Sequence, residues 1–405
     1  MHMVAEVMPL SGNLEWRERL SMMPVPLAVS SDPLTMSCLN SLIEEGRVSR
    51  NQGIKLFENP SLSSVTSLAN MVKKSRYGDN AFFNENLHVN TTNICVLACR
   101  FCAFRKGPRH PDAYELDKDE YLGRIRPFSG SIDEVHTVGG LHPNWDVEDY
   151  CRLFSATKLE FPHIHIKALT AVEIKHLSQR SSLPVKETLS LLSEAGLDSL
   201  PGGGAEILVD HVRDRICMGK ESSREYLDIH SIAHGIGMPT NCTMLFGTVE
   251  TIEDRVEHLI RLREQQDISE GFQCFVPYPF LPDKTRLPEA QLATGSEIIR
   301  VISLSRIMLD NIPHIKAYRM NIGDKLSSLA LTCGADDIDG TVGHEEIMHV
   351  AGSSTRLDTS SDQLAALVSS TGSIPVKRNS NYSTFELYTT NNPSFSRVLP
   401  QIAIN

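Results

Sequence analysis

The sequence predicts an α/β fold: a (β/α)₈ barrel of the TIM type, with a helical extension before it and a short C-terminal extension after it. Strand-like and helix-like stretches alternate between residues 82 and 352, a span close to the roughly 250 residues of such a barrel. A cysteine-rich loop directly follows the first strand, at the end where barrel enzymes carry their chemistry. A doubly wound open sheet is the competing arrangement, because alternation alone does not show that a sheet closes.

The chain divides into four regions. Residues 1–35 contain Met, Ser and Pro with weak periodicity, which predicts a loosely ordered leader. Residues 36–80 place apolar side chains at spacings of three and four, which predicts a helical prelude packed on the barrel. The barrel is expected over residues 81–352. The C-terminal extension follows over residues 353–405, with one helix expected at Asp362–Ser370.

Eight strands are expected from short apolar or alternating stretches. They are Phe82–Asn90, Glu134–Val138, His163–Leu169, Leu197–Leu200, Thr240–Phe246, Gly271–Val276, Ile315–Met320 and Asp336–Asp339. The expected helices between them are Val147–Phe161, Val185–Ala195, Ser223–Gly235, Ile252–Gln265, Glu297–Asp310 and Lys325–Thr332. Because the carboxyl ends of barrel strands meet at one face, the residues that follow each strand are the candidate site residues.

The loop after the first strand carries three cysteines, Cys95, Cys99 and Cys102. Thiolates bind soft metals and iron–sulfur clusters. A closed zinc site or a ferredoxin cluster has four protein ligands, but the next cysteine is Cys151. A [4Fe–4S] cluster on these three thiolates would leave one iron open to an exogenous ligand. The alternatives are cysteines that are merely buried or prone to disulfide formation, and a zinc site completed by His88 or His110.

The spacing of the three cysteines, with the aromatic Phe101 before the last of them, resembles the signature of the radical S-adenosylmethionine superfamily. This resemblance implies a [4Fe–4S] cluster held by the cysteines and S-adenosylmethionine as co-substrate. The methionyl amine and carboxylate of that co-substrate would chelate the open iron, and Phe101 would lie beside it.

Two glycine-containing loops follow later strands and are expected to face the nucleotide. Val138, Gly139 and Gly140 follow the second strand, and glycines let the backbone approach a ligand because no Cβ intervenes. A plain tight turn is the alternative there. Gly203 belongs to a run of three glycines before Glu206, whose carboxylate suits ribose hydroxyls. This second loop lacks the spacing of a phosphate-binding motif.

Four cationic side chains are expected at the barrel mouth, where they can hold a carboxylate substrate: His142, Lys167, His314 and Lys316. With Glu206 they form the predicted catalytic set. Taken singly, each is more often a structural histidine or an exterior lysine, and their grouping at strand ends supports the functional interpretation. The Asp-rich stretch 336–339 is a candidate metal site, but such a stretch before a glycine is more often a turn and helix cap.

The composition is that of a globular enzyme with no nucleic acid or membrane partner. Of the 405 residues, 41% are hydrophobic and 22% are charged, and the net charge is −11, so the chain has no basic footprint. Nine cysteines, mostly isolated in apolar stretches, argue for a reducing compartment. No stretch approaches membrane-spanning length, and we expect a cytoplasmic protein. The basic run 105–109 is a candidate contact for an anionic ligand or a donor protein.

Several blocks together resemble the aminodeoxyfutalosine synthase family of radical S-adenosylmethionine enzymes, which belongs to the futalosine route to menaquinone. The similarity runs from about residue 44 to residue 382. The blocks are residues 92–104, 137–143, 167–174, 201–207, 311–318 and 334–342. The last two separate this family from dehypoxanthine futalosine cyclase and the deazaflavin (FO) synthase subunits. Thr248 stands where His is expected, and Arg319 stands where Trp is expected.

The resemblance implies a transferase that adds the 5′-deoxyadenosyl radical to the double bond of 3-[(1-carboxyvinyl)oxy]benzoate, an aryl enol-ether dicarboxylate. Rearrangement and loss of a carboxyl group as bicarbonate would give 6-amino-6-deoxyfutalosine and methionine. A flavodoxin or ferredoxin is the implied electron donor, docking near the cysteine loop. The competing interpretations are a sister enzyme of menaquinone or deazaflavin biosynthesis, an iron–sulfur electron carrier, and a zinc-stabilised binding module.

Overall fold

The computed structural model describes residues 13–389, whose strands form two sheets. The strands are β1 (Asn80–Phe83), β2 (Asn86–His88), β3 (Glu134–Thr137), β4 (His165–Ala168), β5 (Thr240–Phe246), β6 (Phe272–Pro279), β7 (His314–Ala317), β8 (Asp337–Ile338), β9 (Ile374–Arg378) and β10 (Phe385–Leu387). One sheet has the order β10-β9-β1-β8-β7-β6-β5, and the other has the order β2-β3-β4. All neighbouring strands are parallel except β9 and β10.

The two sheets together form a closed wall, because backbone and side-chain contacts join them at both junctions. The segment Ser199-Leu200 joins them, because it bridges Lys167 of β4 on one side and Thr240 of β5 on the other. At the opposite junction, Asn86 of β2 and the hydroxyl of Thr341 after β8 exchange two hydrogen bonds of 3.0 Å. The closed (β/α)₈ arrangement is therefore confirmed. The fourth expected strand is reduced to two bridges, and the first is split into β1 and β2.

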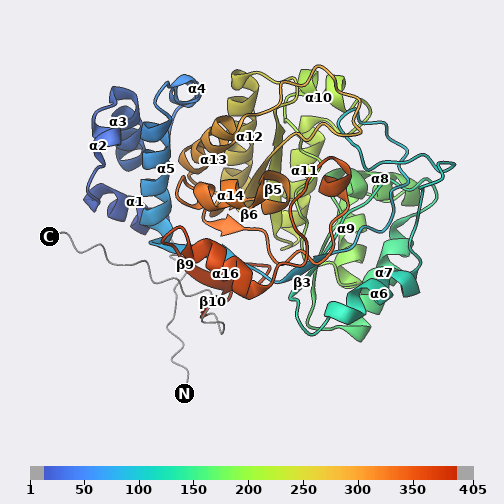
Figure 1. Ribbon diagram of the computed structural model, residues 1–405. Helices are drawn as coiled ribbons and strands as arrows, with labels where there is room; N and C mark the ends of the chain where they lie inside the picture. The colour runs from blue at the N-terminus through green and yellow to red at the C-terminus, as the bar shows by residue number, and fades with distance from the viewer. Residues whose placement is uncertain (1–12, 390–405) are drawn as a thin grey trace.

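The N-terminal helices pack as one group beside the barrel (Figure 1). They are α1 (Asn13–Met22), α2 (Leu27–Ser30), α3 (Pro33–Asn40), the π-helix η1 (Ser41–Glu45), α4 (Arg50–Glu58) and α5 (Leu62–Tyr77). Helices thus occupy the region expected as the helical prelude. The expectation of a loose leader fails over residues 13–35, because Trp16, Leu20 and Val29 are buried in the core. Residues 1–12 lie outside the described residues.

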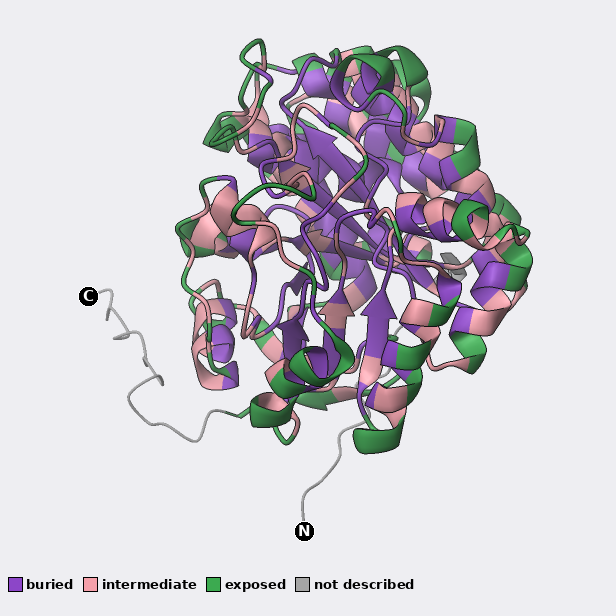
Figure 2. Cartoon of the chain, turned by 90° about the vertical axis from the view of Figure 1, so that its right-hand side faces the viewer, coloured by how far each residue is buried: buried purple, intermediate pink, exposed green. Residues whose placement is uncertain are grey.

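Helices surround the wall and turn their apolar faces toward it (Figure 2). They are α6 (Lys118–Ile125), η2 (Arg126–Phe128), α7 (Val147–Glu160), α8 (Ala171–Ser181), α9 (Val185–Glu194), α10 (Asp210–Ile216), α11 (Ser223–Gly235), α12 (Ile252–Ser269), α13 (Gly295–Met308) and α14 (Arg319–Leu331). The six expected helices are present, whereas the sequence did not predict α6, α8 or α10. No helix within residues 13–389 is long and apolar enough to cross a membrane.

The seventh strand ends earlier than expected. β7 stops at Ala317, and α14 begins at Arg319 inside the stretch predicted as strand to Met320. The cause is Asp339, whose carboxylate accepts hydrogen bonds from the backbone amides of Arg319 and Met320 and so caps the helix. The cap interpretation of the Asp-rich stretch thus holds for Asp339.

The C-terminal extension completes the sheet. A short helix, α15 (Ile347–Val350), precedes α16 (Ser361–Ser369), which matches the expected helix, and β9 then pairs with β1 over its first four residues. Arg378 at the end of β9 is buried and forms an ion pair with Asp337 of β8. The extension is therefore tied into the barrel wall by both backbone pairing and charge.

Candidate active site

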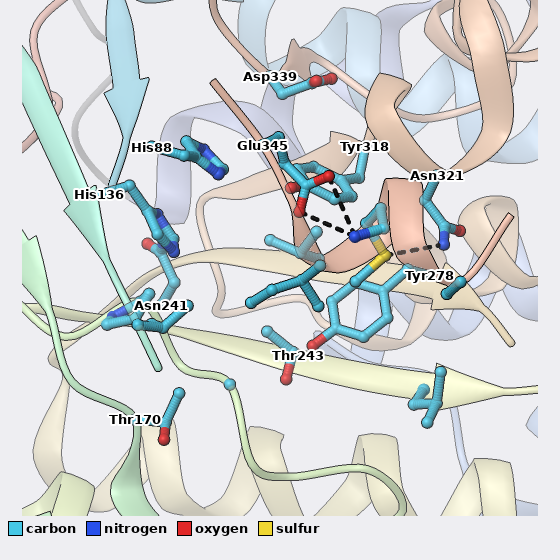
Figure 3. A pocket seen from close by; sticks show the side chains of 18 of the residues that line it. His88, His136, Thr170, Asn241, Thr243, Tyr278, Tyr318, Asn321, Asp339 and Glu345 are labelled. Atoms are coloured by element: carbon cyan, nitrogen blue, oxygen red, sulfur yellow. Dashed lines mark hydrogen bonds between the residues drawn. The ribbon is translucent and has the colours of Figure 1, made fainter. Parts of the chain in front are cut away.

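A cavity of about 260 Å³ lies inside the barrel and reaches the loops after the strands. Its walls come from alternate strand residues, because every second side chain points inward. Those on one side are Asn86 and His88 of β2, Glu134 and His136 of β3, and Lys167 of β4; those on the other are Asn241, Thr243 and Leu245 of β5, Val276 and Tyr278 of β6, and Lys316 of β7. The barrel interior thus carries polar and charged side chains among apolar ones, and Figure 3 shows the two histidines opposite the two tyrosines, Tyr278 and Tyr318.

The cysteine loop lies at the mouth of this cavity, which Phe101 and Cys102 line. Three neighbouring segments fix the loop: Cys95 N donates to Lys106 O at 3.0 Å, Arg100 N to Ile216 O at 2.8 Å, and the Arg286 side chain to Ala98 O at 2.7 Å. All three loop cysteines are free. Burial raises the pKa of the Cys99 thiol to about 12 and also raises that of Cys102. Metal binding would therefore release protons here.

The donor set fits an iron–sulfur cluster better than a single ion. Within residues 13–389, no group of three His, Cys, Asp or Glu side chains is placed to hold one metal ion. His88 lies inside the barrel, stacked on His136, and His110 is exposed beside Asp112, so neither completes a zinc site. A cluster is larger than one ion and holds its thiolates at separate corners, which suits three cysteines spread along a loop.

The paired glycines serve the packing of two loops. A Cβ on Gly140 would lie 2.2 Å from Ile94 O, and one on Gly139 would lie 2.9 Å from the Thr91 hydroxyl. Gly139 N donates to the Glu173 carboxylate at 3.0 Å, and burial raises the pKa of Glu173 to about 7. The glycines therefore let this loop lie against the segment that leads into the cysteines. Of the three predicted cofactor residues here, Val138 lines the cavity.

The second glycine loop also reaches the mouth, through Gly203 and Glu206. Glu206 adopts a left-handed backbone with φ of 44°, an uncommon conformation for this residue type. Its carboxylate accepts a hydrogen bond from Lys220, whose ammonium lies 5.7 Å from the centre of the Phe101 ring. Sequence reasoning missed Lys220, because this residue follows a helix and not a strand. The Glu206–Lys220 ion pair and the Phe101 ring thus lie together beside the cysteine loop.

The four predicted cations separate into two pairs. Lys167 and Lys316 line the cavity; Lys167 forms a buried ion pair with Glu134 at 2.7 Å, and Lys316 lies 3.3 Å from Asp337. His142 and His314 do not line it.

His142 sits in a separate small cleft against Trp145, with its Nε2 2.6 Å from Glu115. His314 is the first residue of β7, so it lies at the opposite end of the strand from the mouth, stacked between Tyr77 and Tyr382 and paired with Asp336. The expectation that both face the mouth is corrected by these positions.

The two departures from the family pattern also lie off the cavity lining. Thr248 is buried, and its hydroxyl and amide both donate to Glu250. Arg319 is buried as well, with its guanidinium directed to Asp324 and to Arg356 O. Neither side chain contacts the space where a substrate can bind, so both substitutions concern loop and helix packing.

A parallel barrel whose mouth carries three free thiols is typical of an enzyme that binds an iron–sulfur cluster. Sequence comparison specifies the class: residues 89–262 match the Radical SAM superfamily, and residues 269–391 match the CofH/MqnC C-terminal region. The chain belongs to the radical SAM superfamily, in the branch that includes the aminodeoxyfutalosine synthases. Members of this superfamily are enzymes that use a [4Fe–4S] cluster and S-adenosylmethionine.

The sequence matches to curated relatives cover nearly the full length of those proteins. Aminodeoxyfutalosine synthase of Thermus thermophilus is 38% identical over 87% of this chain and 96% of its own. That of Streptomyces coelicolor is 37% identical over 84% and 92%. Cyclic dehypoxanthine futalosine synthase of Streptomyces coelicolor is 33% identical over 88% and 91%.

Among solved structures, methylornithine synthase (PylB) superposes with a TM-score of 0.68 at 18% identity, covering 83% of this chain and 96% of its own. HydG, a maturase of the [FeFe]-hydrogenase, superposes with a TM-score of 0.67 at 12% identity, covering 91% and 80%. These two structures support the fold alone.

Proposed function

We propose that this enzyme transfers the 5′-deoxyadenosyl group of S-adenosylmethionine to 3-[(1-carboxyvinyl)oxy]benzoate, forming 6-amino-6-deoxyfutalosine, methionine and bicarbonate. The relatives named aminodeoxyfutalosine synthase support this assignment through near full-length similarity. The observation that carries it is the cavity itself, in which lysines and tyrosines share one enclosed space directly below the cysteine loop. A dicarboxylate with an aromatic ring needs both kinds of side chain.

The position of each residue in the site indicates its proposed role. Cys95, Cys99 and Cys102 would hold the cluster. Bound there, cluster and S-adenosylmethionine would supply an electron and an adenosyl radical. Glu206 would accept hydrogen bonds from the ribose, and Val138 and Gly203 would contact the nucleotide. The cationic side chains of the cavity bind carboxylates, and its enclosing walls keep water and stray hydrogen donors from the reacting carbons.

The deciding experiment is anaerobic incubation of the reconstituted, reduced enzyme with S-adenosylmethionine and the carboxyvinyl ether, followed by mass spectrometry. We expect an adenosyl adduct that has lost one carboxyl group. Free 5′-deoxyadenosine as the sole nucleoside product would instead indicate a hydrogen-abstracting sister enzyme. A colourless protein that contains zinc would overturn the proposal entirely.

An acidic electron carrier such as flavodoxin or ferredoxin is the proposed partner, and a cytoplasmic location follows from the same proposal. The surface beside the cysteine loop combines exposed Val96 and Met218 with Lys106 and Arg109. Leu97 contacts Gly219, so the loop and the segment carrying Met218 are adjacent. Apolar groups surrounded by basic ones suit an anionic protein partner.

This partner assignment is tested by the double variant K106E/R109E, with K55E/K186E on other exposed surfaces as the matched control. We expect the first to raise the KM for reduced flavodoxin by about tenfold, since rim charges steer association. Turnover with dithionite, a small reductant, should be unchanged. Equal KM values for both double variants would contradict the proposed surface.

A further inference from the structure

Three cavity side chains form one row across neighbouring strands. His88 of β2 is in register with His136 of β3, and His136 is in register with Lys167 of β4. The two imidazole rings are stacked, with centroids 4.4 Å apart and planes inclined by 16°. All three line the cavity, two residues deeper along β3 than Val138 at its mouth. The row therefore lies below the mouth, and Asn86 and Glu134 line the cavity deeper still.

The two histidines are neutral hydrogen-bonding groups with almost no protein partners. Burial lowers the pKa of His88 to about 3 and that of His136 to about 4, so both rings are uncharged at neutral pH. The ring nitrogens of His136 have no hydrogen bond within the described residues, and His88 Nε2 has only Asn86 Nδ2, at 3.5 Å. A neutral imidazole always carries one N–H donor. Two such donors therefore remain for a ligand.

The charges around this row leave one cation without a full partner. Lys167 is paired with Glu134 at 2.7 Å. Asp337 is shared by Arg378, whose guanidinium donates to both carboxylate oxygens, and by Lys316 at the longer distance of 3.3 Å. Lys316 thus has the more distant share of a carboxylate whose main partner is Arg378.

The other acids at the cavity are occupied elsewhere. Asp339 caps α14, and Glu345 accepts hydrogen bonds from the amide of Met348 and from His349 (Figure 3). Neither forms an ion pair with Lys316, although the charge of Lys316 also acts on the Asp339 carboxylate. Lys316, with its single long ion pair, and the two neutral donors are therefore suited to hold a carboxylate.

We propose that His88, His136 and Lys316 bind the ring carboxylate of the aryl enol ether, so that its vinyl carbon points up toward the cysteine loop. This inference rests on the proposed function and adds the orientation of the substrate. Tyr278 and Tyr318, with centroids 6.2 Å apart, lie above Lys316 and flank the space left for the aromatic ring. The second carboxylate, on the vinyl group, then lies near the mouth.

The test uses His136→Phe, which keeps a stacked ring but removes both nitrogens, and His88→Phe as its partner. His163→Phe on the exposed outside of the barrel is the matched control. Anaerobic calorimetry would measure Kd for the full substrate, for 3-(vinyloxy)benzoate, which lacks the vinyl carboxylate, and for 2-phenoxyacrylate, which lacks the ring carboxylate. Iron content confirms that each variant folds and loads its cluster.

We expect both histidine variants to weaken binding of the full substrate and of 3-(vinyloxy)benzoate by about 10- to 100-fold, as for lost hydrogen bonds to a charged group. Binding of 2-phenoxyacrylate should change less than about twofold. Equal losses for the two analogues, or a loss confined to 2-phenoxyacrylate, would overturn the orientation while leaving the proposed function standing. If the wild-type enzyme neither binds nor converts the full substrate, the proposed function itself fails.

Discussion

Cys99 is the most deeply buried of the three loop cysteines, and it packs on the hydrophobic core. Cys99→Ala keeps a small apolar side chain at this position, so we expect the fold to survive. The variant should lose most of its iron after reconstitution and release no detectable methionine. Iron and sulfide analysis with methionine quantification measures this, and Cys151→Ser, a cysteine on α7, is the control. Turnover retained by Cys99→Ala would contradict the ligand assignment.

Gly140 illustrates how one missing Cβ positions a loop. A methyl group there would meet the backbone of Ile94 at 2.2 Å, and backbone cannot move aside as a flexible side chain can. We expect Gly140→Ala to destabilise the protein by about 1–3 kcal/mol in urea unfolding and to reduce iron loading. Gly123 on α6 is exposed, with open space around it, so Gly123→Ala should be neutral or stabilise by about 0.5–1 kcal/mol. Similar losses in both variants would contradict this account.

Among the elements, β9 shows what the C-terminal extension does for the barrel. Arg378 and Asp337 are both fully buried, and each is the other's main charge partner. Arg378→Met leaves Asp337 with Lys316 alone, and breaking a buried pair costs about 3–5 kcal/mol. We expect a loss of that size in the free energy of urea unfolding. Arg126→Met removes an exposed partner of Glu160 and should cause no measurable change. Equal effects would show that β9 is held by backbone pairing alone.

The strand elements also show where sequence reasoning succeeds and where it stops. The alternation in Asn86–Asn90 correctly predicted a strand, but polar alternate residues are normally assigned to solvent. Here Leu87 and Val89 are buried in the core, while Asn86 and His88 line the cavity. His136 was missed as a site residue for this reason, and His88 was considered only as an alternative zinc ligand. A row of polar residues at alternate positions in consecutive buried strands is the signal that would have found them.

Tertiary contacts explain the remaining differences. The end of β7 depends on a cap from Asp339, twenty residues further along the chain, and no local propensity encodes it. Similarly, Trp16 and Leu20 sit in a region of weak periodicity and are ordered by packing against the rest of the core. The cysteine motif, by contrast, is local, and its loop lies at the cavity mouth where the barrel rule places chemistry.

At the scale of the whole molecule, buried histidines make stability depend on pH. Burial lowers the pKa of His258 to about 3, because the charged ring is poorly solvated there. Below pH 6.5 the unfolded chain binds a proton at this histidine that the folded protein does not bind. The contribution of the neutral ring to the free energy of unfolding is therefore complete above pH 6.5 and is lost as the pH falls toward 3. Over that pH range, each such histidine adds about 1.4 kcal/mol per pH unit to the slope of the unfolding free energy against pH.

We therefore expect the free energy of urea unfolding to fall between pH 6.5 and pH 5. His258→Asn can still accept the hydrogen bond from Leu208 N, and it should reduce the slope by about one proton. His163→Asn, on the exposed surface, should leave the slope nearer to that of the wild type. An unchanged slope in His258→Asn would show that this histidine titrates normally in the folded protein.

The junction at Ser199-Leu200 determines where the barrel wall opens locally most easily. β5 pairs with β6 along its whole length, whereas β4 and β5 are joined only through residues 198–200, whose amides donate to Ile166 O and Pro239 O. The amides of residues 198–200 should exchange with deuterium faster than those of β5 under native conditions, because fewer neighbouring hydrogen bonds must break.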